Sequence, residues 1–257
     1  MDWEEAGRGW GARALDWAYL DEPYARPAND ELFDRLGVGV GTRLLDVACG
    51  SGYAASTASR RGASVAGLDA SAALIDIARA RSPAADFRVG DMFALPFDDD
   101  SFDVVTSFNG IWKGCEAALS EVRRVLIDGG RFGMTFWGPR DRLGLLPFFL
   151  KIVELSPPSH QAATMEQGRT RRVVEDMLRA TQFRLLDQGA VDVVMELPDV
   201  ETAVRALAAA GPAVPAIESV GYESFCRELR EVIAPLHDPH TGIRITSEFR
   251  WVTAQPT

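Results

Sequence analysis

Residues 44–52 read Leu-Leu-Asp-Val-Ala-Cys-Gly-Ser-Gly, and this stretch decides the fold class. Its apolar start is typical of a buried strand, and the glycines that follow allow a tight turn. Residues 53–61 predict a helix of small residues, which Gly62 ends at its C′ position. The start of that helix leaves unpaired backbone N–H groups at a turn that a ligand can approach closely.

Strands and helices alternate along the rest of the chain. Short apolar or alternating runs predict seven strands, at residues 43–47, 64–68, 87–89, 102–107, 130–137, 183–197 and 243–252. Apolar spacing predicts helices at 12–20, 29–36, 53–61, 115–126, 171–180, 200–209 and 222–236, another helix capped by Ser71, and a turn at 22–27. We therefore expect an α/β fold, a doubly wound and mostly parallel seven-stranded sheet of the Rossmann-like type, with N-terminal helices and a helical cap.

The composition is that of an ordinary globular protein, with 47% apolar and 25% charged residues among 257. The 27 basic and 37 acidic residues give a net charge of −10, which disfavours nucleic acid as a main partner. The three cysteines form no CxxC pair, so a disulfide framework or a cysteine zinc site is not expected. The chain starts without a signal-peptide pattern and has no apolar run of membrane-spanning length, so we expect a cytoplasmic protein without a membrane partner.

Three acidic residues stand at the ends of three successive predicted strands: Asp46, Asp69 and Asp91. Asp46 is placed to accept a ligand's ammonium, Asp69 to accept ribose hydroxyls, and Asp91 to accept from an adenine amine. The residues alone leave alternatives, because Gly50–Ala55 also matches the dinucleotide pattern G-x-G-x-x-A and Asp46 could cap the next helix. Without a phosphate-binding lysine, the three acids favour S-adenosylmethionine over NAD or ATP.

In combination, these segments resemble a class I S-adenosylmethionine-dependent methyltransferase, similar to the small-molecule enzymes around ubiquinone and menaquinone biosynthesis. Residues 44–52 match the family's first motif and residues 65–71 its second. The stretch 90–103, the residues 108–110 and the stretch 121–131 match later motifs. Two departures are Ala48 in place of the first glycine and Asp128 in place of the usual proline before Gly129-Gly130.

The resemblance implies which part of the cofactor each predicted site residue would contact. The turn residues Asp46, Ala48, Gly50 and Gly52 would surround the amino-acid end of the cofactor. The other implied contacts are Asp69 and Ala70 at the ribose, Asp91 and Met92 at the adenine, and Phe108 and Asn109 at the sulfonium. The cofactor-binding set is completed by three neighbours of these residues, Cys49, Phe93 and Gly110.

The sequence gives less support for a catalytic or metal-binding role of the cysteines and histidines. Cys49 has no histidine near it in the sequence and is expected to pack rather than act as a nucleophile. The pair His237 and His240 lies in a proline-containing turn, so no metal site is predicted. His160 is a candidate general base. No catalytic residue is assigned, because methyl transfer from a sulfonium needs mainly proximity and alignment.

The predicted function is S-adenosylmethionine-dependent methyl transfer to a small, partly apolar acceptor, with S-adenosylhomocysteine as product. We expect a single domain, 1–257, in which 42–137 bind the cofactor, 1–40 form a helical lid, and 140–170 and 198–240 cover the substrate. The alternatives are a cyclisation or other non-methyl reaction on the same fold, a non-catalytic cofactor-binding protein, and an NAD-dependent oxidoreductase. The oligomeric state is left open between monomer and homodimer.

Overall fold

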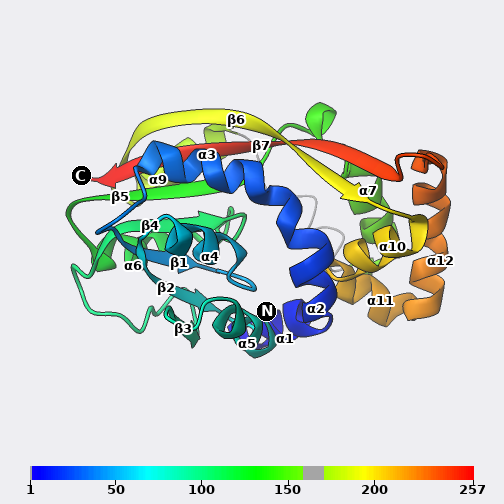
Figure 1. Ribbon diagram of the computed structural model, residues 1–257, viewed down its shortest axis with the longest axis horizontal. Helices are drawn as coiled ribbons and strands as arrows, with labels where there is room; N and C mark the ends of the chain where they lie inside the picture. The colour runs from blue at the N-terminus through cyan, green and yellow to red at the C-terminus, as the bar shows by residue number, and fades with distance from the viewer. Residues whose placement is uncertain (1, 159–170) are drawn as a thin grey trace.

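A seven-stranded sheet forms the centre of the computed structural model, which describes residues 2–158 and 171–257 (Figure 1). The strand order is β3-β2-β1-β4-β5-β7-β6. Strands β1 to β5 are parallel, and β7 runs antiparallel to both of its neighbours, β5 and β6. The strand bounds are β1 Arg43–Val47, β2 Ser64–Asp69, β3 Asp86–Val89, β4 Phe102–Phe108, β5 Leu126–Trp137, β6 Phe183–Leu197 and β7 Ile243–Pro256. The predicted α/β class with a mostly parallel sheet is confirmed.

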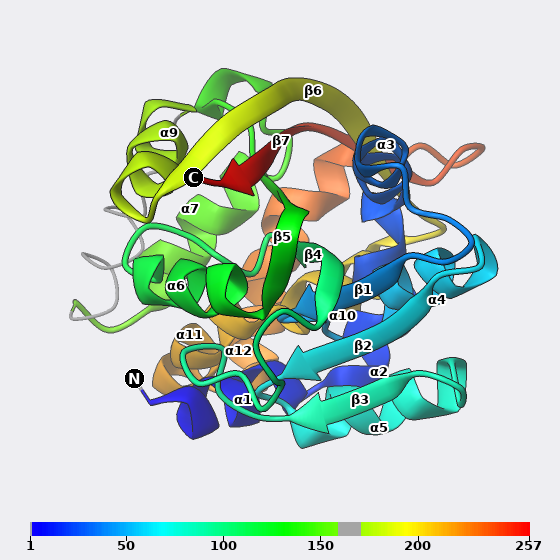
Figure 2. The same ribbon diagram turned by 90° about the vertical axis from the view of Figure 1, so that its left-hand side faces the viewer.

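Helices cover both faces of the sheet, as a doubly wound fold requires. Helices α3, α4 and α5 lie on one face, and α6 and α9 lie on the other (Figure 2). Their bounds are α3 Arg26–Leu36, α4 Tyr53–Arg60, α5 Ala72–Arg81, α6 Glu116–Val125 and α9 Arg171–Ala180. Because the chain leaves β1 for β2 on one side and returns to β4 on the other, the carboxyl ends of β1 and β4 flank a topological switch point, where ligands of such sheets bind.

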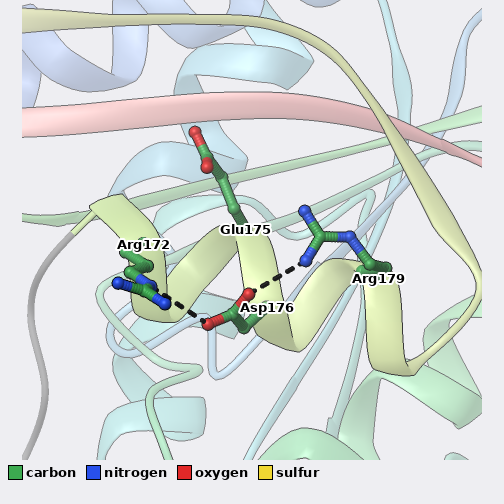
Figure 3. Close-up of a pocket in the computed structure, with 4 residues that line it drawn as sticks. All are labelled: Arg172, Glu175, Asp176 and Arg179. Atoms are coloured by element: carbon green, nitrogen blue, oxygen red, sulfur yellow. Dashed lines mark hydrogen bonds and ion pairs between the residues drawn. The ribbon is translucent and has the colours of Figure 1, made fainter.

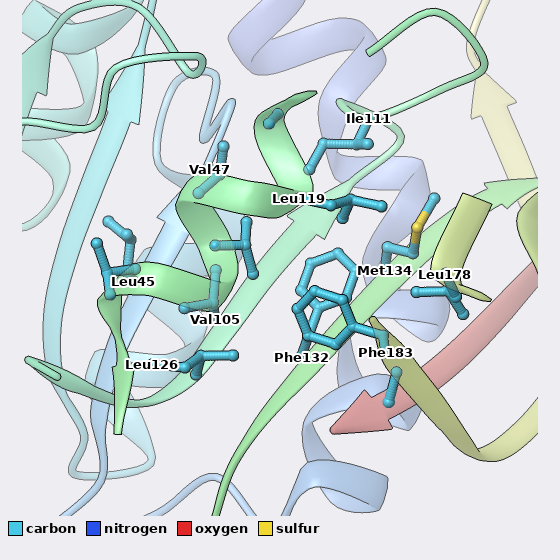
Figure 4. Packing of buried hydrophobic residues seen from close by; sticks show 14 of the residues in the cluster. Leu45, Val47, Val105, Ile111, Leu119, Leu126, Phe132, Met134, Leu178 and Phe183 are labelled. Atoms are coloured by element: carbon cyan, nitrogen blue, oxygen red, sulfur yellow. The ribbon is translucent and has the colours of Figure 1, made fainter. Parts of the chain in front are cut away.

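The larger core lies between the sheet and helices α6 and α9. Leucines, valines and phenylalanines from β1, β4 and β5 meet the apolar faces of the two helices there (Figure 4). Phe132 of β5 and Phe183 of β6 lie with their ring centroids 5.6 Å apart. This packing fixes the sheet whose strand ends carry the predicted site.

A helical cap packs around its own apolar cluster, at one end of the molecule in Figure 1. Its helices are α7 Leu146–Leu155, α10 Val200–Ala208, α11 Val214–Val220 and α12 Tyr222–Ile233. Helix α7 follows β5, and α10 to α12 connect β6 to β7, so the cap lies at the carboxyl ends of β5 and β6. Helix α11 was not predicted, because Pro212 and Pro215 in this stretch indicated a loop. Both prolines fall in first turns, where a missing N–H costs no helical bond.

The N-terminal segment is more helical than its sequence indicated. It comprises α1 Trp3–Gly11, α2 Ala14–Asp16, a π-helical turn η1 Trp17–Asp21, a 3₁₀ turn η2 Glu22–Ala25 and then α3. The predicted turn at 22–27 is wrong, because Pro23 and Pro27 occupy first turns of η2 and α3 rather than a break between helices. Within the described residues, no helix is long and apolar enough to cross a membrane.

Candidate functional site

The turn between β1 and α4 has a backbone that few residues adopt. Ala48, Gly50 and Gly52 all have positive φ, at 58°, 56° and 70°. A side chain at Gly52 would place its Cβ 2.8 Å from the Cβ of Ala78, so the glycine also lets α4 pack closely on α5. Ala48, the departure from the family's glycine, takes the left-handed conformation despite its side chain, at a cost of about 1–2 kcal/mol.

Asp69 ties this turn to the end of β2. One carboxylate oxygen accepts the N–H of Gly50 at 2.9 Å, and the other accepts the N–H of Ser71 at 2.8 Å. Ser71 in turn caps α5, as predicted, by accepting the N–H of Leu74 at 3.3 Å. Burial raises the pKa of Asp69, and its hydrogen bonds to backbone N–H groups oppose that rise. The predicted ribose ligand is therefore also a structural support of the glycine turn.

Asp46 is buried in the sheet next to the turn, with 1% of its surface exposed. Its carboxylate accepts the hydroxyl of Thr106 on β4 at 2.8 Å. It does not cap α4, since Gly52 stands at the N-cap of that helix without a side-chain bond. Burial raises the pKa of Asp46 to about 8, the bond from Thr106 opposes the rise, and the charges of Glu22 and Asp69 add to it.

The remaining predicted residues lie at the ends of β3 and β4. Asp91 follows β3, and its carboxylate accepts the N–H of Phe93 at 2.9 Å. The N–H of Gly90 donates to the carbonyl of Asp69, which holds the end of β3 beside that of β2. The side chain of Met92 packs on the larger core, and that of Phe93 is exposed.

The end of β4 reaches the other side of the glycine turn. The ring of Phe108 packs edge-on against Phe33, with centroids 5.3 Å apart. Asn109 has a positive φ of 56°, and its N–H donates to the hydroxyl of Thr135 at 3.1 Å. A Cβ added to Gly110 would lie 2.5 Å from the Cβ of Ala48, so the ends of β1 and β4 are in close contact.

The structure adds residues from the N-terminal segment that the sequence analysis did not single out. The carboxylate of Glu22 lies on the glycine turn, where the N–H of Ser51 donates to it at 3.2 Å. Arg81 of α5 forms an ion pair with Glu22 at 3.3 Å and donates to the carbonyls of Ser51 and Ala18. No local pattern marked these residues, because the contacts join segments 29 to 63 positions apart.

The same segment covers the glycine turn with a tryptophan. The rings of Trp10 and Trp17 meet edge to face, with centroids 4.8 Å apart. A Cβ on Gly50 would lie 3.6 Å from the indole nitrogen of Trp17. Helix α1 also packs closely on the end of β2, since a Cβ on Gly7 would overlap the carbonyl of Ala70.

The other reactive side chains show no catalytic arrangement among the described residues. Cys49 is buried, and burial raises the pKa of its thiol well above the ordinary value, so the thiol stays protonated. Within residues 2–158 and 171–257, no group of three or more histidines, cysteines and acids could hold a metal. His160, the candidate general base, lies outside the described residues.

A surface hollow of about 500 Å³ lies over helix α9, away from the predicted site residues (Figure 3). It is lined by Arg172, Glu175, Asp176 and Arg179. Asp176 pairs with Arg179 at 3.0 Å and with Arg172 at 4.0 Å. Charges that pair along one exposed helix face are typical of a solvated surface, so this hollow is not the candidate site.

The buried carboxyl groups predict how stability depends on pH. Asp46 and Glu22, with pKa values raised to about 8 and about 7, bind protons more tightly in the folded chain than in the unfolded chain. The free energy of unfolding is therefore expected to fall by a few kcal/mol between about pH 5 and about pH 8. Urea unfolding across this range would measure the slope, and Asp46→Asn should flatten it. A free energy that stays level or rises would contradict the assignment.

Comparison with known proteins connects this geometry to a family. Residues 45–134 match the family described as a methyltransferase domain. A demethylmenaquinone methyltransferase from Renibacterium salmoninarum is 40% identical over 100 residues, which are 38% of this chain and 42% of that protein. A phthiotriol/phenolphthiotriol dimycocerosates methyltransferase from Mycobacterium leprae is 36% identical over 149 residues, 51% of this chain and 55% of that one. The chain thus spans about half the length of the curated relatives it matches.

Two solved structures share the fold over most of the chain. The [4+2]-cyclase SpnF aligns with a TM-score of 0.59 and 21% identity, over 90% of this chain and 81% of that one. Geranyl diphosphate C-methyltransferase from Streptomyces coelicolor, solved with Mg²⁺, geranyl diphosphate and S-adenosylhomocysteine, aligns with a TM-score of 0.53 and 20% identity, over 90% and 79%. At this identity the two structures establish the fold alone. Together with the sequence match at 45–134, the fold identifies a class I methyltransferase domain, the domain of the S-adenosylmethionine-dependent methyltransferases.

Proposed function

We propose that the protein binds S-adenosylmethionine at the carboxyl ends of β1 to β4 and transfers its methyl group to a small, partly apolar organic acceptor. The observation that carries the proposal is the glycine turn at 48–52, bracketed by the buried acids Asp46 and Asp69. The methyltransferase match covers this turn and both acids. The relatives named above act as methyltransferases, which supports the same reaction class here.

The residues present suit this cofactor. Gly50 lacks the Cβ that would block close approach to the backbone, and three carboxyl groups near the turn favour a cationic ligand. Ser107, buried beside Ala48 and Gly110, has a hydroxyl with no hydrogen-bond partner among the described residues, which leaves a polar atom for a ligand. In the proposed arrangement Asp46 and the turn hold the amino-acid end, Asp69 and Ala70 the ribose, Asp91 to Phe93 the adenine, and Phe108 to Gly110 the sulfonium.

The bound cofactor would supply a methyl group on a positively charged sulfur. The contribution of the chain is to orient the acceptor, to exclude water and to align the two reactants, which can account for about 7–11 kcal/mol of a reaction barrier. The N-terminal segment and the cap flank the carboxyl ends of the strands, so residues 2–40, 140–158 and 198–240 are the proposed cover of the acceptor. The predicted cover at 159–170 lies outside the described residues.

The acceptor is proposed to be partly apolar because the region between the N-terminal segment and the cap is aromatic. Trp137, at the end of β5, contacts Tyr24, Phe149 and Phe249, with centroids between 4.5 and 6.5 Å apart. Leu20 and Tyr24 of the N-terminal segment also pack on the apolar cluster of the cap. The relatives are named as methyltransferases of demethylmenaquinone and of phthiotriol/phenolphthiotriol dimycocerosates, which supports an acceptor of this kind.

A titration calorimetry experiment with S-adenosylhomocysteine tests the cofactor assignment. The titration gives the dissociation constant. At a ligand concentration of about 100 times that constant, the free energy of unfolding, measured separately in urea, should rise by about 2.7 kcal/mol. Transfer of a labelled methyl group to quinol, phenol and lipid alcohol acceptors then tests the reaction. Absence of binding would refute the proposal, and binding with cyclisation but no methylated product would favour the cyclase alternative. The cytoplasmic location and the choice between monomer and homodimer stay predictions from the sequence.

A further inference from the structure

Glu22 stands where the N-terminal segment meets the glycine turn. It follows the π-helical turn at 17–21, a form of helix that is rare and frequent at functional sites. Its side chain is 15% exposed. One carboxylate oxygen, Oε2, accepts the hydroxyl of Ser51 and pairs with Arg81. The other, Oε1, accepts the N–H of Ser51 at 3.2 Å and no second donor among the described residues.

The Oε1 atom of Glu22 packs directly against Gly50. A Cβ built on Gly50 would lie 2.6 Å from Oε1 of Glu22 and 3.6 Å from the indole nitrogen of Trp17. Glu22 and Trp17 therefore occupy the side of Gly50 on which a side chain would stand, and a ligand that contacts the backbone of the turn there meets both of them.

The charges around this point are unbalanced. Glu22, Asp46 and Asp69 are close enough for the charges of Glu22 and Asp69 to raise the pKa of Asp46. Burial raises the pKa of Glu22 to about 7, and the bond from Ser51 and the charge of Arg81 oppose that rise. Among the described residues, Arg81 is the one cation whose positive charge offsets the negative charges of Glu22, Asp46 and Asp69. Three carboxyl groups against one guanidinium favour a ligand that brings positive charge.

We propose that Glu22 is a cofactor-binding residue that accepts the α-ammonium group of S-adenosylmethionine, with Arg81 as the residue that positions its carboxylate. The inference rests on the proposed function and extends it to the N-terminal segment. A glutamate at this point selects ligands with an amino-acid end over otherwise similar nucleosides. It also adds a contact through the ligand to the direct bonds that already join Glu22 to Ser51, so cofactor binding should hold the N-terminal segment more firmly on the turn.

The test compares two ligands that differ in this end alone. S-adenosylhomocysteine carries the amino acid, whereas 5′-methylthioadenosine carries the same adenosine and thioether without it. The Glu22→Gln variant keeps the size of the side chain. Calorimetry should show that its affinity for S-adenosylhomocysteine is about 10- to 100-fold lower than that of the wild type, the range for a lost charged hydrogen bond. The affinity for 5′-methylthioadenosine should change by less than about twofold. Glu31→Gln, which removes an exposed partner of Arg35, is the matched control and should change neither.

Proton exchange provides a second readout. In the wild-type protein, binding of the ammonium group should drive a proton off the carboxyl cluster near pH 7, which calorimetry in buffers of different ionisation enthalpy measures. Glu22→Gln should reduce this release. If the Gln variant does not fold, Glu22→Asp, which withdraws the carboxylate by one methylene, should show the same selective loss for S-adenosylhomocysteine.

The outcomes separate this inference from the function on which it rests. Equal losses for both ligands, or no loss for either, would overturn the role of Glu22 while leaving the cofactor assignment intact. Wild-type protein that binds neither ligand would overturn the proposed function and the inference with it.

Discussion

An Asp69→Ala variant is expected to lose about 2–4 kcal/mol of folding free energy and at least about tenfold in affinity for S-adenosylhomocysteine. The two losses share one cause. The carboxylate accepts the N–H groups of Gly50 and Ser71, so its removal leaves two donors without partners at the glycine turn. It also removes the proposed acceptor for the ribose hydroxyls. Urea unfolding and calorimetry measure the two effects on the same sample.

The control for Asp69 is Asp76→Ala, which removes an acid from the exposed face of α5, where it pairs with Arg79. This variant should leave the free energy of unfolding and the free energy of binding S-adenosylhomocysteine within about 0.5 kcal/mol of the wild-type values. An Asp69→Asn variant keeps one acceptor oxygen, so its stability and its affinity should lie between those of Asp69→Ala and those of the wild type. If Asp69→Ala lost stability but kept its affinity, Asp69 would be a support of the turn and the ribose would bind elsewhere.

A Gly110→Ala variant is expected to lose about 1–3 kcal/mol of folding free energy through overpacking. Its new Cβ would stand 2.5 Å from the Cβ of Ala48 and 2.8 Å from the hydroxyl of Ser107. Both neighbours belong to strand ends, so the ends of β1 and β4 would have to separate. Combining Gly110→Ala with Ala48→Gly removes one of the two clashes and the strain of a positive φ at Ala48, so the double variant should regain part of the loss.

The measurement is a double-mutant cycle in urea, with Gly39→Ala as the control. A Cβ on Gly39 meets its nearest atom, the carbonyl oxygen of Arg61, at 3.8 Å, so this variant should unfold close to the wild type. If the effects of Gly110→Ala and Ala48→Gly simply added, the two strand ends would not be in contact and the described geometry of the turn would be wrong.

The sequence predicted the sheet and the acids at its strand ends because both leave local marks. A buried parallel strand is a short apolar run, and the residue after it lies at the carboxyl edge whatever the tertiary packing. Asp46, Asp69 and Asp91 could therefore be assigned to that edge from their positions alone. The capping of α5 by Ser71 was predictable for the same reason, since a cap bonds to a residue three positions away.

The contribution of the N-terminal segment could not be predicted in the same way. The bond between Glu22 and Ser51 spans 29 positions, and that between Arg81 and Ala18 spans 63, so neither leaves a local pattern. Pro23 and Pro27 indicated a turn because prolines break helices in their interiors, but they are tolerated in first turns. The double use of Asp69, on Gly50 and Ser71, likewise became evident only from the folded backbone.

The long ladder between β6 and β7 has a consequence for how the protein could change over evolution. Pairing runs from Phe183 opposite Pro256 to Leu197 opposite Ile243, so the cap residues 198–242 leave and re-enter the sheet at directly paired neighbours. A segment whose ends lie side by side can be lengthened, shortened or exchanged without shifting the register of the strands that hold it. If residues 198–242 set acceptor choice, one sheet and one cofactor site can serve many acceptors, with new specificities arising from replacement of this one continuous part of the cap, while α7 joins the cap from the separate segment after β5.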